Sequence, residues 1–172
     1  MSTFVPCSID YITTYMQTTL ILIGKTDEKY LIDGMKIYAE RIPHYTPFDI
    51  KVIPDIRNVK NLSHDQQKAA EAQAVMALIQ PSDVLVIMDE NGKQFTSRQF
   101  ADYLAKMAVQ GTRRLLFLIG GPYGFDKSIY DRANFKISLS PMTFSHQMVR
   151  LIFLEQLYRA HTIIKGQPYH HD

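Results

Sequence analysis

The amino-acid sequence predicts an α/β domain with a mostly parallel sheet and helices on both of its faces. Short apolar, β-branched segments of strand length alternate along the chain with longer segments whose apolar residues recur at helical spacing. Such alternation is typical of parallel sheets, in which each crossover carries a helix. The chain has 172 residues and contains no internal repeat, low-complexity run or linker, so we expect a single domain.

The first half of the chain contains two predicted strands, each followed by a predicted helix. Residues 18–23 (TTLILI) are apolar and β-branched, and residues 48–53 alternate in polarity. Residues 27–41 carry apolar side chains at helical spacing, which indicates the first helix. Residues 65–80 are rich in alanine and stop before Pro81, so they are expected to form the second.

The second half continues the alternation. Residues 83–88 (DVLVIM), 114–119 (RLLFLI) and 135–139 are predicted strands, separated by predicted helices at residues 97–110 and 127–132. A last helix is expected from Ser145 to about His161. Its apolar residues surround most of its circumference: Met148, Val149, Leu151, Ile152, Phe153, Leu154, Leu157, Tyr158 and Ala160. This pattern favours a self-association surface, with deep burial inside one chain as the alternative.

Composition excludes several classes of protein. Cys7 is the single cysteine, so no internal disulfide forms, and no spacing of His and Cys indicates a metal site. No apolar run approaches the ~20 residues of a membrane-spanning helix, and residues 1–15 lack the pattern of a signal peptide. We expect a cytoplasmic protein in which Met16 is the natural start, residues 1–15 are a disordered extension, and residues 16–172 form the domain.

Charge is unevenly distributed along the chain. Residues 1–99 carry ten basic and twelve acidic side chains, whereas residues 100–172 carry nine basic and five acidic ones. A polyanionic partner would therefore bind mainly the C-terminal part, although an uneven solvated surface explains the same numbers.

Three loops, at residues 89–94, 120–125 and 140–144, leave the carboxyl ends of the last three predicted strands, where ligands bind in open α/β sheets. In the loop at 120–125, Gly120 and Gly121 leave backbone bare for a ligand, or form an ordinary turn. The loop at 140–144 (SPMTF) is small and uncharged, so it suits a flat heterocycle with a sulfur-bearing chain. The alternative is a plain connection in which Ser145 caps the last helix.

The C-terminal tail (KGQPYHHD) holds a tyrosine and two histidines. These residues either fold over the ligand site, where histidine moves protons near neutrality, or form a loose terminus. His146 and Arg150, four residues apart, either meet an anion or form a structural pair.

The segments LIGGPYG, LSPMTFSHQMVRLIFLEQLYRA and GQPYHHD together resemble the ribosomal RNA large subunit methyltransferase H family, small single-domain members of the SPOUT methyltransferases. The resemblance extends from Thr18 to the end of the chain. It implies a deep C-terminal trefoil knot, a homodimer whose sites are completed at the subunit interface, and S-adenosylmethionine as methyl donor. The implied substrate is a pseudouridine of 23S rRNA, methylated at N3 on the assembled ribosome.

The resemblance also implies site residues. Those implied for the cofactor are Met88, Gly120, Gly121, Leu139, Ser140, Pro141, Met142, Thr143, Phe144 and Ser145. In the tail, His170 is implied as the catalytic base or substrate positioner, and Tyr169 as a stacking or hydrogen-bonding partner for the substrate nucleobase. His171 stands where the family usually has arginine, so it or Arg150 is a candidate substitute. Candidate RNA contacts are Arg132, His146, Arg150 and Lys165.

Two other functions stay open at this point. A different SPOUT enzyme would methylate a tRNA or a ribose, and the GQPYHHD ending argues against it. A non-catalytic ribosome-binding homologue would have lost its chemistry, for which the replacement at His171 is the only indication.

Overall fold

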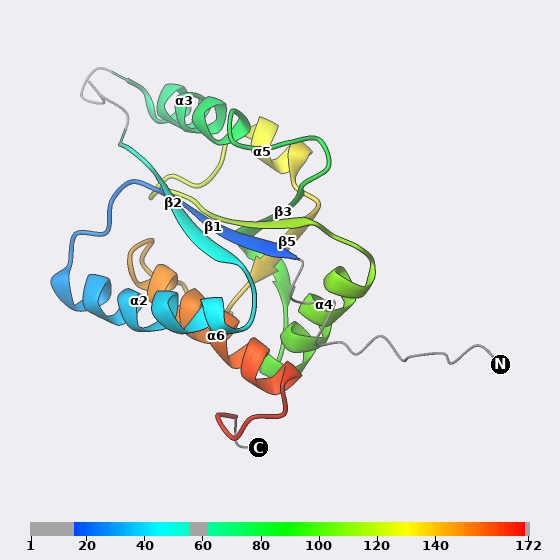
Figure 1. Cartoon of the computed structure of the whole chain (residues 1–172). Helices are drawn as coiled ribbons and strands as arrows, with labels where there is room; N and C mark the ends of the chain where they lie inside the picture. Colours follow the sequence, from blue (N-terminus) through cyan, green and yellow to red (C-terminus); the bar gives the residue numbers. More distant parts are fainter. Residues whose placement is uncertain (1–15, 56–61, 171–172) are drawn as a thin grey trace.

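A computed structural model describes residues 16–55 and 62–170 (Figure 1). Its five strands form one sheet in the order β2-β1-β4-β3-β5, and every neighbouring pair is parallel. The strands are β1 (Gln17–Ile23), β2 (Phe48–Ile53), β3 (Val84–Gln94), β4 (Arg114–Ile119) and β5 (Phe135–Ser138). The predicted parallel sheet is confirmed, whereas the trefoil knot stays a prediction. The predictions for residues 1–15 and for His171 lie outside the described residues.

Helices cover both faces of the sheet, as predicted (Figure 1). One face packs against α2 (Lys29–Arg41), α4 (Ser97–Val109) and α6 (Met148–Ile164), and the other against α3 (His64–Met76) and α5 (Lys127–Arg132). A single 3₁₀ turn, η1 (Ile42–His44), follows α2 and was not predicted. Central strand β4 supplies both cores because successive side chains point to opposite faces: Phe117 contacts the α6 side and Leu118 the α3 side.

The helix starts follow from capping. Ser63 and Gln66 form a capping box at α3, and Thr96 and Gln99 form another at α4. In each box, two backbone N–H groups at the start of the helix donate hydrogen bonds to side-chain oxygens. The last helix begins three residues later than predicted, at Met148. The Oγ atom of Ser145 accepts a hydrogen bond from the Met148 N–H at 3.1 Å, so this serine caps the helix from outside it.

Arg150 is fully buried in the first turn of α6. Its Nη2 donates to the carbonyl oxygen of Ile23 at 2.6 Å, and its Nη1 donates to that of Gly24 at 3.0 Å and to Thr26 Oγ1 at 2.9 Å. Its Nε donates to the carbonyl of His146 at 3.1 Å. Burial lowers the pKa of this guanidinium. Its donors hold the end of β1 onto α6, so the predicted RNA contact by Arg150, or its replacement of a tail arginine, would compete with these internal partners and stays a prediction.

Arg132 also stabilises the fold. Its Nη2 donates to the carbonyl oxygens of Gln80 and Asp83, both at 2.9 Å, and its Nη1 to Asn134 Oδ1 at 3.1 Å. These bonds join the end of α5 to the start of β3. The predicted RNA contact by Arg132 would thus compete with three internal partners.

His161 is a second buried polar residue of α6. Its ring stacks on Tyr45 with centroids 5.9 Å apart, and its Nε2 has no hydrogen-bond partner among residues 16–55 and 62–170. Burial, with a smaller effect of Lys165, lowers the pKa of His161 to about 4. The fold therefore holds this imidazole neutral.

Arg150→Met should lower the free energy of unfolding by about 3 kcal/mol, because the carbonyls of Ile23 and Gly24 stay buried and lose their donors. Urea denaturation measures the change. Arg113→Met, at an exposed arginine, is the matched control and should change stability by less than about 0.5 kcal/mol. Equal effects of the two substitutions would refute the structural role of Arg150.

Acidification should destabilise the protein through His161. Its pKa is about 4 in the folded chain and about 6.5 in the unfolded chain, so the unfolded state binds its proton first. The stability contributed by the neutral ring is complete above pH 6.5 and is lost as the pH falls toward 4, by roughly 3 kcal/mol. His161→Phe should flatten this dependence of unfolding free energy on pH, whereas the exposed His44→Gln control should retain it.

Candidate functional site

A cavity of about 620 Å³ lies at the carboxyl ends of β4 and β5 and beside the irregular middle of β3 at residues 88–91, next to the start of α6. Because these three strands are neighbours in the sheet, the three predicted loops meet there. Nine of the ten residues implied for the cofactor line the cavity, namely Met88, Gly120, Gly121, Leu139, Ser140, Met142, Thr143, Phe144 and Ser145. Pro141 lies in the same loop without lining it.

The cavity is lined by apolar and polar residues in similar measure, and two of the polar ones are acidic. Ile119 and Val149 extend the apolar surface beyond the predicted residues. Asp89 and Glu90 also line it, and they were not predicted as site residues although they directly follow a predicted strand. Two carboxylates in the lining, with no Lys or Arg among the lining residues, favour a ligand that carries positive charge.

Asp89 is held in place by two hydrogen bonds. Its Oδ2 accepts from the Tyr130 hydroxyl at 2.6 Å and its Oδ1 from the Asn91 N–H at 2.9 Å. Burial, followed by the hydrogen bond to Asp89, raises the pKa of Tyr130 to about 12, so the phenol remains a donor.

The turn that contains Asp89 and Glu90, called the acidic turn below, packs closely against β5. Pairing between β3 and β5 shifts at Met88, resumes at Lys93, and leaves the intervening residues looped out. A Cβ atom on Gly92 would lie 2.5 Å from the backbone carbon of Ile137, so only glycine fits at this position. The predicted loop is thus an irregular part of β3.

Gly120 and Gly124 of the GGPYG segment are each required by the fold, for different reasons. A Cβ atom on Gly120 would lie 2.9 Å from the ring of Phe125, and Gly124 has a φ of +75°, which favours glycine. The prediction of a ligand against bare backbone is therefore not needed to explain Gly120. Tyr123 stacks on His64 of α3 at 3.9 Å between ring centroids, which fixes the loop from outside.

Internal hydrogen bonds shape the loop that precedes α6. Ser138 Oγ donates to the carbonyl of Ser140 at 2.9 Å, and Ser140 Oγ accepts from the Met142 N–H at 2.9 Å. Gln147 anchors the end of the loop, since its Oε1 accepts from the Asp27 N–H at 3.1 Å. Met142 projects from the cavity rim and is 77% exposed.

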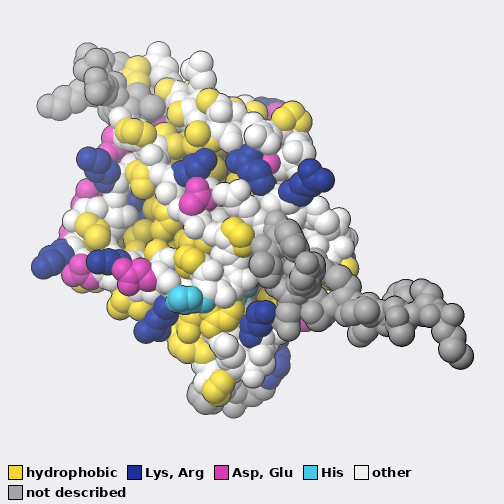
Figure 2. All heavy atoms as spheres, viewed as in Figure 1, with side chains coloured by type: hydrophobic (Ala, Val, Ile, Leu, Met, Phe, Trp, Pro, Cys, Tyr) yellow, Lys and Arg dark blue, Asp and Glu magenta, His cyan; other side chains and the backbone are white. Residues whose placement is uncertain are grey.

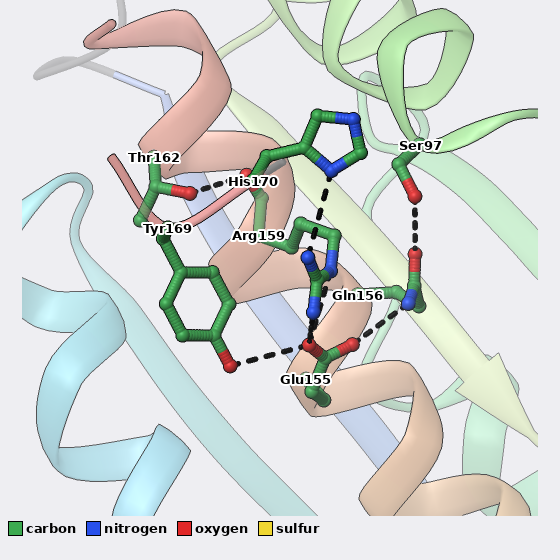
Figure 3. A network of polar contacts seen from close by, with 7 residues as sticks. All are labelled: Ser97, Glu155, Gln156, Arg159, Thr162, Tyr169 and His170. Atoms are coloured by element: carbon green, nitrogen blue, oxygen red, sulfur yellow. Dashed lines mark hydrogen bonds and ion pairs between the residues drawn. The ribbon is translucent and has the colours of Figure 1, made fainter. Parts of the chain in front are cut away.

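The tail lies on a different face of α6 from the cavity. Tyr169 donates to Glu155 Oε1 at 3.2 Å, and His170 Nδ1 lies 3.5 Å from Arg159 Nη1 (Figure 3). Val149 lines the cavity, and Glu155 follows it by six residues, or about 9 Å along the helix and about 240° around it. Within one chain, the predicted cofactor residues and the predicted catalytic residues are therefore separate.

The candidate RNA contacts do not form one cluster. His146 lines the cavity, Lys165 follows α6, and Arg132 lies near the start of β3. On the face shown in Figure 2, Lys and Arg side chains lie singly among acidic and apolar ones.

No group of three or more metal-ligating side chains occurs in the described part of the chain, and no helix there is long and apolar enough to cross a membrane.

Comparison with known proteins identifies the family. The family model described as "Predicted SPOUT methyltransferase" matches residues 16–170. The chain is 54% identical over 157 residues to a "Ribosomal RNA large subunit methyltransferase H" of Parabacteroides distasonis, which covers 91% of this chain and 100% of that protein. The protein of the same name from Christiangramia forsetii is 54% identical, in an alignment that covers 91% of this chain and 99% of that protein. The one from Bacteroides fragilis is 50% identical, in an alignment that covers 91% of this chain and 100% of that protein. The chain therefore belongs to the SPOUT methyltransferase family and, within it, to the ribosomal RNA large subunit methyltransferases H.

Proposed function

We propose that this protein is an S-adenosylmethionine-dependent methyltransferase that modifies N3 of a pseudouridine in 23S rRNA of the assembled ribosome. The observation that carries the proposal is the cavity at the ends of β4 and β5 and beside the middle of β3, in a chain 54% identical to proteins named for methylation of large-subunit rRNA. Ribosomes are its proposed partners, and the cytoplasm is its proposed location.

The residues of the cavity fit the proposed cofactor. A volume of about 620 Å³ lies within the range of small-molecule sites, and the apolar side chains of Met88, Ile119 and Val149 suit an adenine ring. When bound, S-adenosylmethionine supplies a methyl group on a positively charged sulfur. Asp89 and Glu90 would attract that charge, while Gly92 keeps the acidic turn in position.

The substrate base would be held by the tail. N3 of pseudouridine carries a proton, so the site must align N3 and stabilise the ring as that proton leaves. Burial, then Tyr38 and Glu155, raise the pKa of Tyr169, so its phenol stays protonated and serves as a donor or stacking surface rather than a base. His170, the described tail histidine, is the remaining candidate for proton transfer or for a hydrogen bond to the base.

A homodimer would unite the cavity and the tail. The tail covers the side of α6 that points away from the sheet, where Glu155 and Arg159 lie, and it does not reach the cavity of its own chain. A second copy packed beside α6 would bring its tail to that cavity. RNA contacts would then come from both chains, with His146 and Lys165 as candidates, and the modest net charge of +2 suits a composite ribosomal surface.

Met88→Ala should weaken S-adenosylmethionine binding roughly tenfold, because it removes apolar contact from the cavity without altering the backbone. Isothermal titration calorimetry measures the affinity. Met76→Ala removes the same side chain from α3, outside the cavity, and should leave the affinity unchanged. Equal affinities for the two variants would exclude Met88 from the binding site.

Purified ribosomes from a strain lacking the modification should accept a methyl group from S-adenosylmethionine in the presence of the protein. Mapping should place the label at N3 of a pseudouridine in 23S rRNA, with far lower activity on separated subunits and naked rRNA. A label in tRNA or on a ribose would support a different SPOUT activity. A folded protein that binds no cofactor would refute the enzymatic proposal.

A further inference from the structure

Glu155 is the centre of a polar network between α6, α4 and the tail (Figure 3). Its Oε1 accepts hydrogen bonds from Arg159 Nε at 3.1 Å, from Arg159 Nη2 and from the Tyr169 hydroxyl at 3.2 Å. Its Oε2 accepts from Gln156 Nε2 at 2.7 Å, and Gln156 Oε1 in turn accepts from Ser97 Oγ at 3.1 Å. Both carboxylate oxygens are thus used, and the orientation of Glu155 is fixed from two helices.

Arg159 connects this carboxylate to both tail side chains. Its guanidinium carbon lies 4.8 Å from the centre of the Tyr169 ring, and its Nη1 lies 3.5 Å from His170 Nδ1. The side chains of Arg159 and Glu155 are only 24% and 20% exposed, so they are held between the helix and the tail. The hydrogen bonds with Glu155 raise the pKa of Arg159, which therefore stays charged.

The guanidinium determines which nitrogen of His170 carries the proton. Arginine has donors and no acceptor, so the Nδ1 that faces it presents a lone pair. The proton of the neutral ring then lies on Nε2, on the other side of the imidazole. A ring held in this way presents its N–H group on the side that faces away from Arg159.

We propose that Glu155 and Arg159 are positioning residues that hold His170 as the Nε2–H tautomer and Tyr169 in a fixed orientation. His170 then donates a hydrogen bond to a carbonyl oxygen of the substrate base, which stabilises the ring while the N3 proton passes to solvent water. This role rests on the proposed methyltransferase function, because the substrate is the one inferred there.

The test compares Glu155→Gln, Arg159→Lys and Arg159→Met with the wild-type protein in single-turnover methyl transfer to ribosomes. The rate should fall roughly 10- to 100-fold in Glu155→Gln and Arg159→Met, because the tail loses its fixed geometry. Arg159→Lys keeps the positive charge but loses the two-nitrogen contact that the guanidinium makes with Glu155, so it should retain an intermediate rate. Affinity for S-adenosylmethionine should match the wild type, since the network lies on another face of α6 from the cavity.

Glu40→Gln is the matched control. Glu40 pairs with Lys36 at 3.8 Å with the same four-residue spacing on α2, and its side chain is 66% exposed. This variant should keep the full rate. Variants of Glu155 and Arg159 that also keep the full rate would overturn the positioning role.

Imidazole ¹⁵N NMR of His170 in alkaline buffer gives a readout that does not depend on activity. The wild-type protein should show an unprotonated Nδ1 and a protonated Nε2, and Arg159→Met should show a mixture of tautomers. A wild-type His170 protonated on Nδ1 would refute the inference. An inactive wild-type protein with the expected tautomer would instead contradict the proposed function.

Discussion

The buried guanidinium of Arg150 joins the parts of the molecule on which the proposed site depends. Its hydrogen bonds to the carbonyls of Ile23 and Gly24 fix the first turn of α6 against the end of β1. The loop that lines the cavity ends at this turn, and the tail returns along the far side of the same helix. The position of one helix therefore sets the geometry of both halves of the site. A charge inside a core is tolerated here because backbone oxygens surround it.

Separation of the cavity from the tail gives α6 its unusual composition. The side toward the sheet buries Phe153, Leu154 and Leu157, whereas the other side holds an ion pair under the tail. An apolar pattern that extends around a helix thus has two sources in one chain, the sheet and the neighbouring helices α2 and α4. The proposed dimer would add a third.

Strand and helix positions were predictable because they follow from local signals. Apolar runs locate the strands, and the adjacency of β3, β4 and β5 makes three loops meet at one cavity. Partners of polar side chains were not predictable, since Arg150 contacts residues more than a hundred positions away. Gly120 was assigned to a ligand, and only the fold shows that Phe125 needs the space. Glu155 and Arg159 look like an ordinary helical pair until the tail is placed over them.

The short edge strand β5 has a consequence for how copies of this chain associate. It contains four residues, includes the exposed Lys136, and has one strand neighbour. At the opposite edge, β2 is bounded by Pro47 and Pro54. Short length, lysine and proline at sheet edges oppose strand-to-strand aggregation. In the proposed dimer, contact between copies would therefore fall on helical surfaces, and the sheet stays protected from the open-ended growth that exposed edges invite.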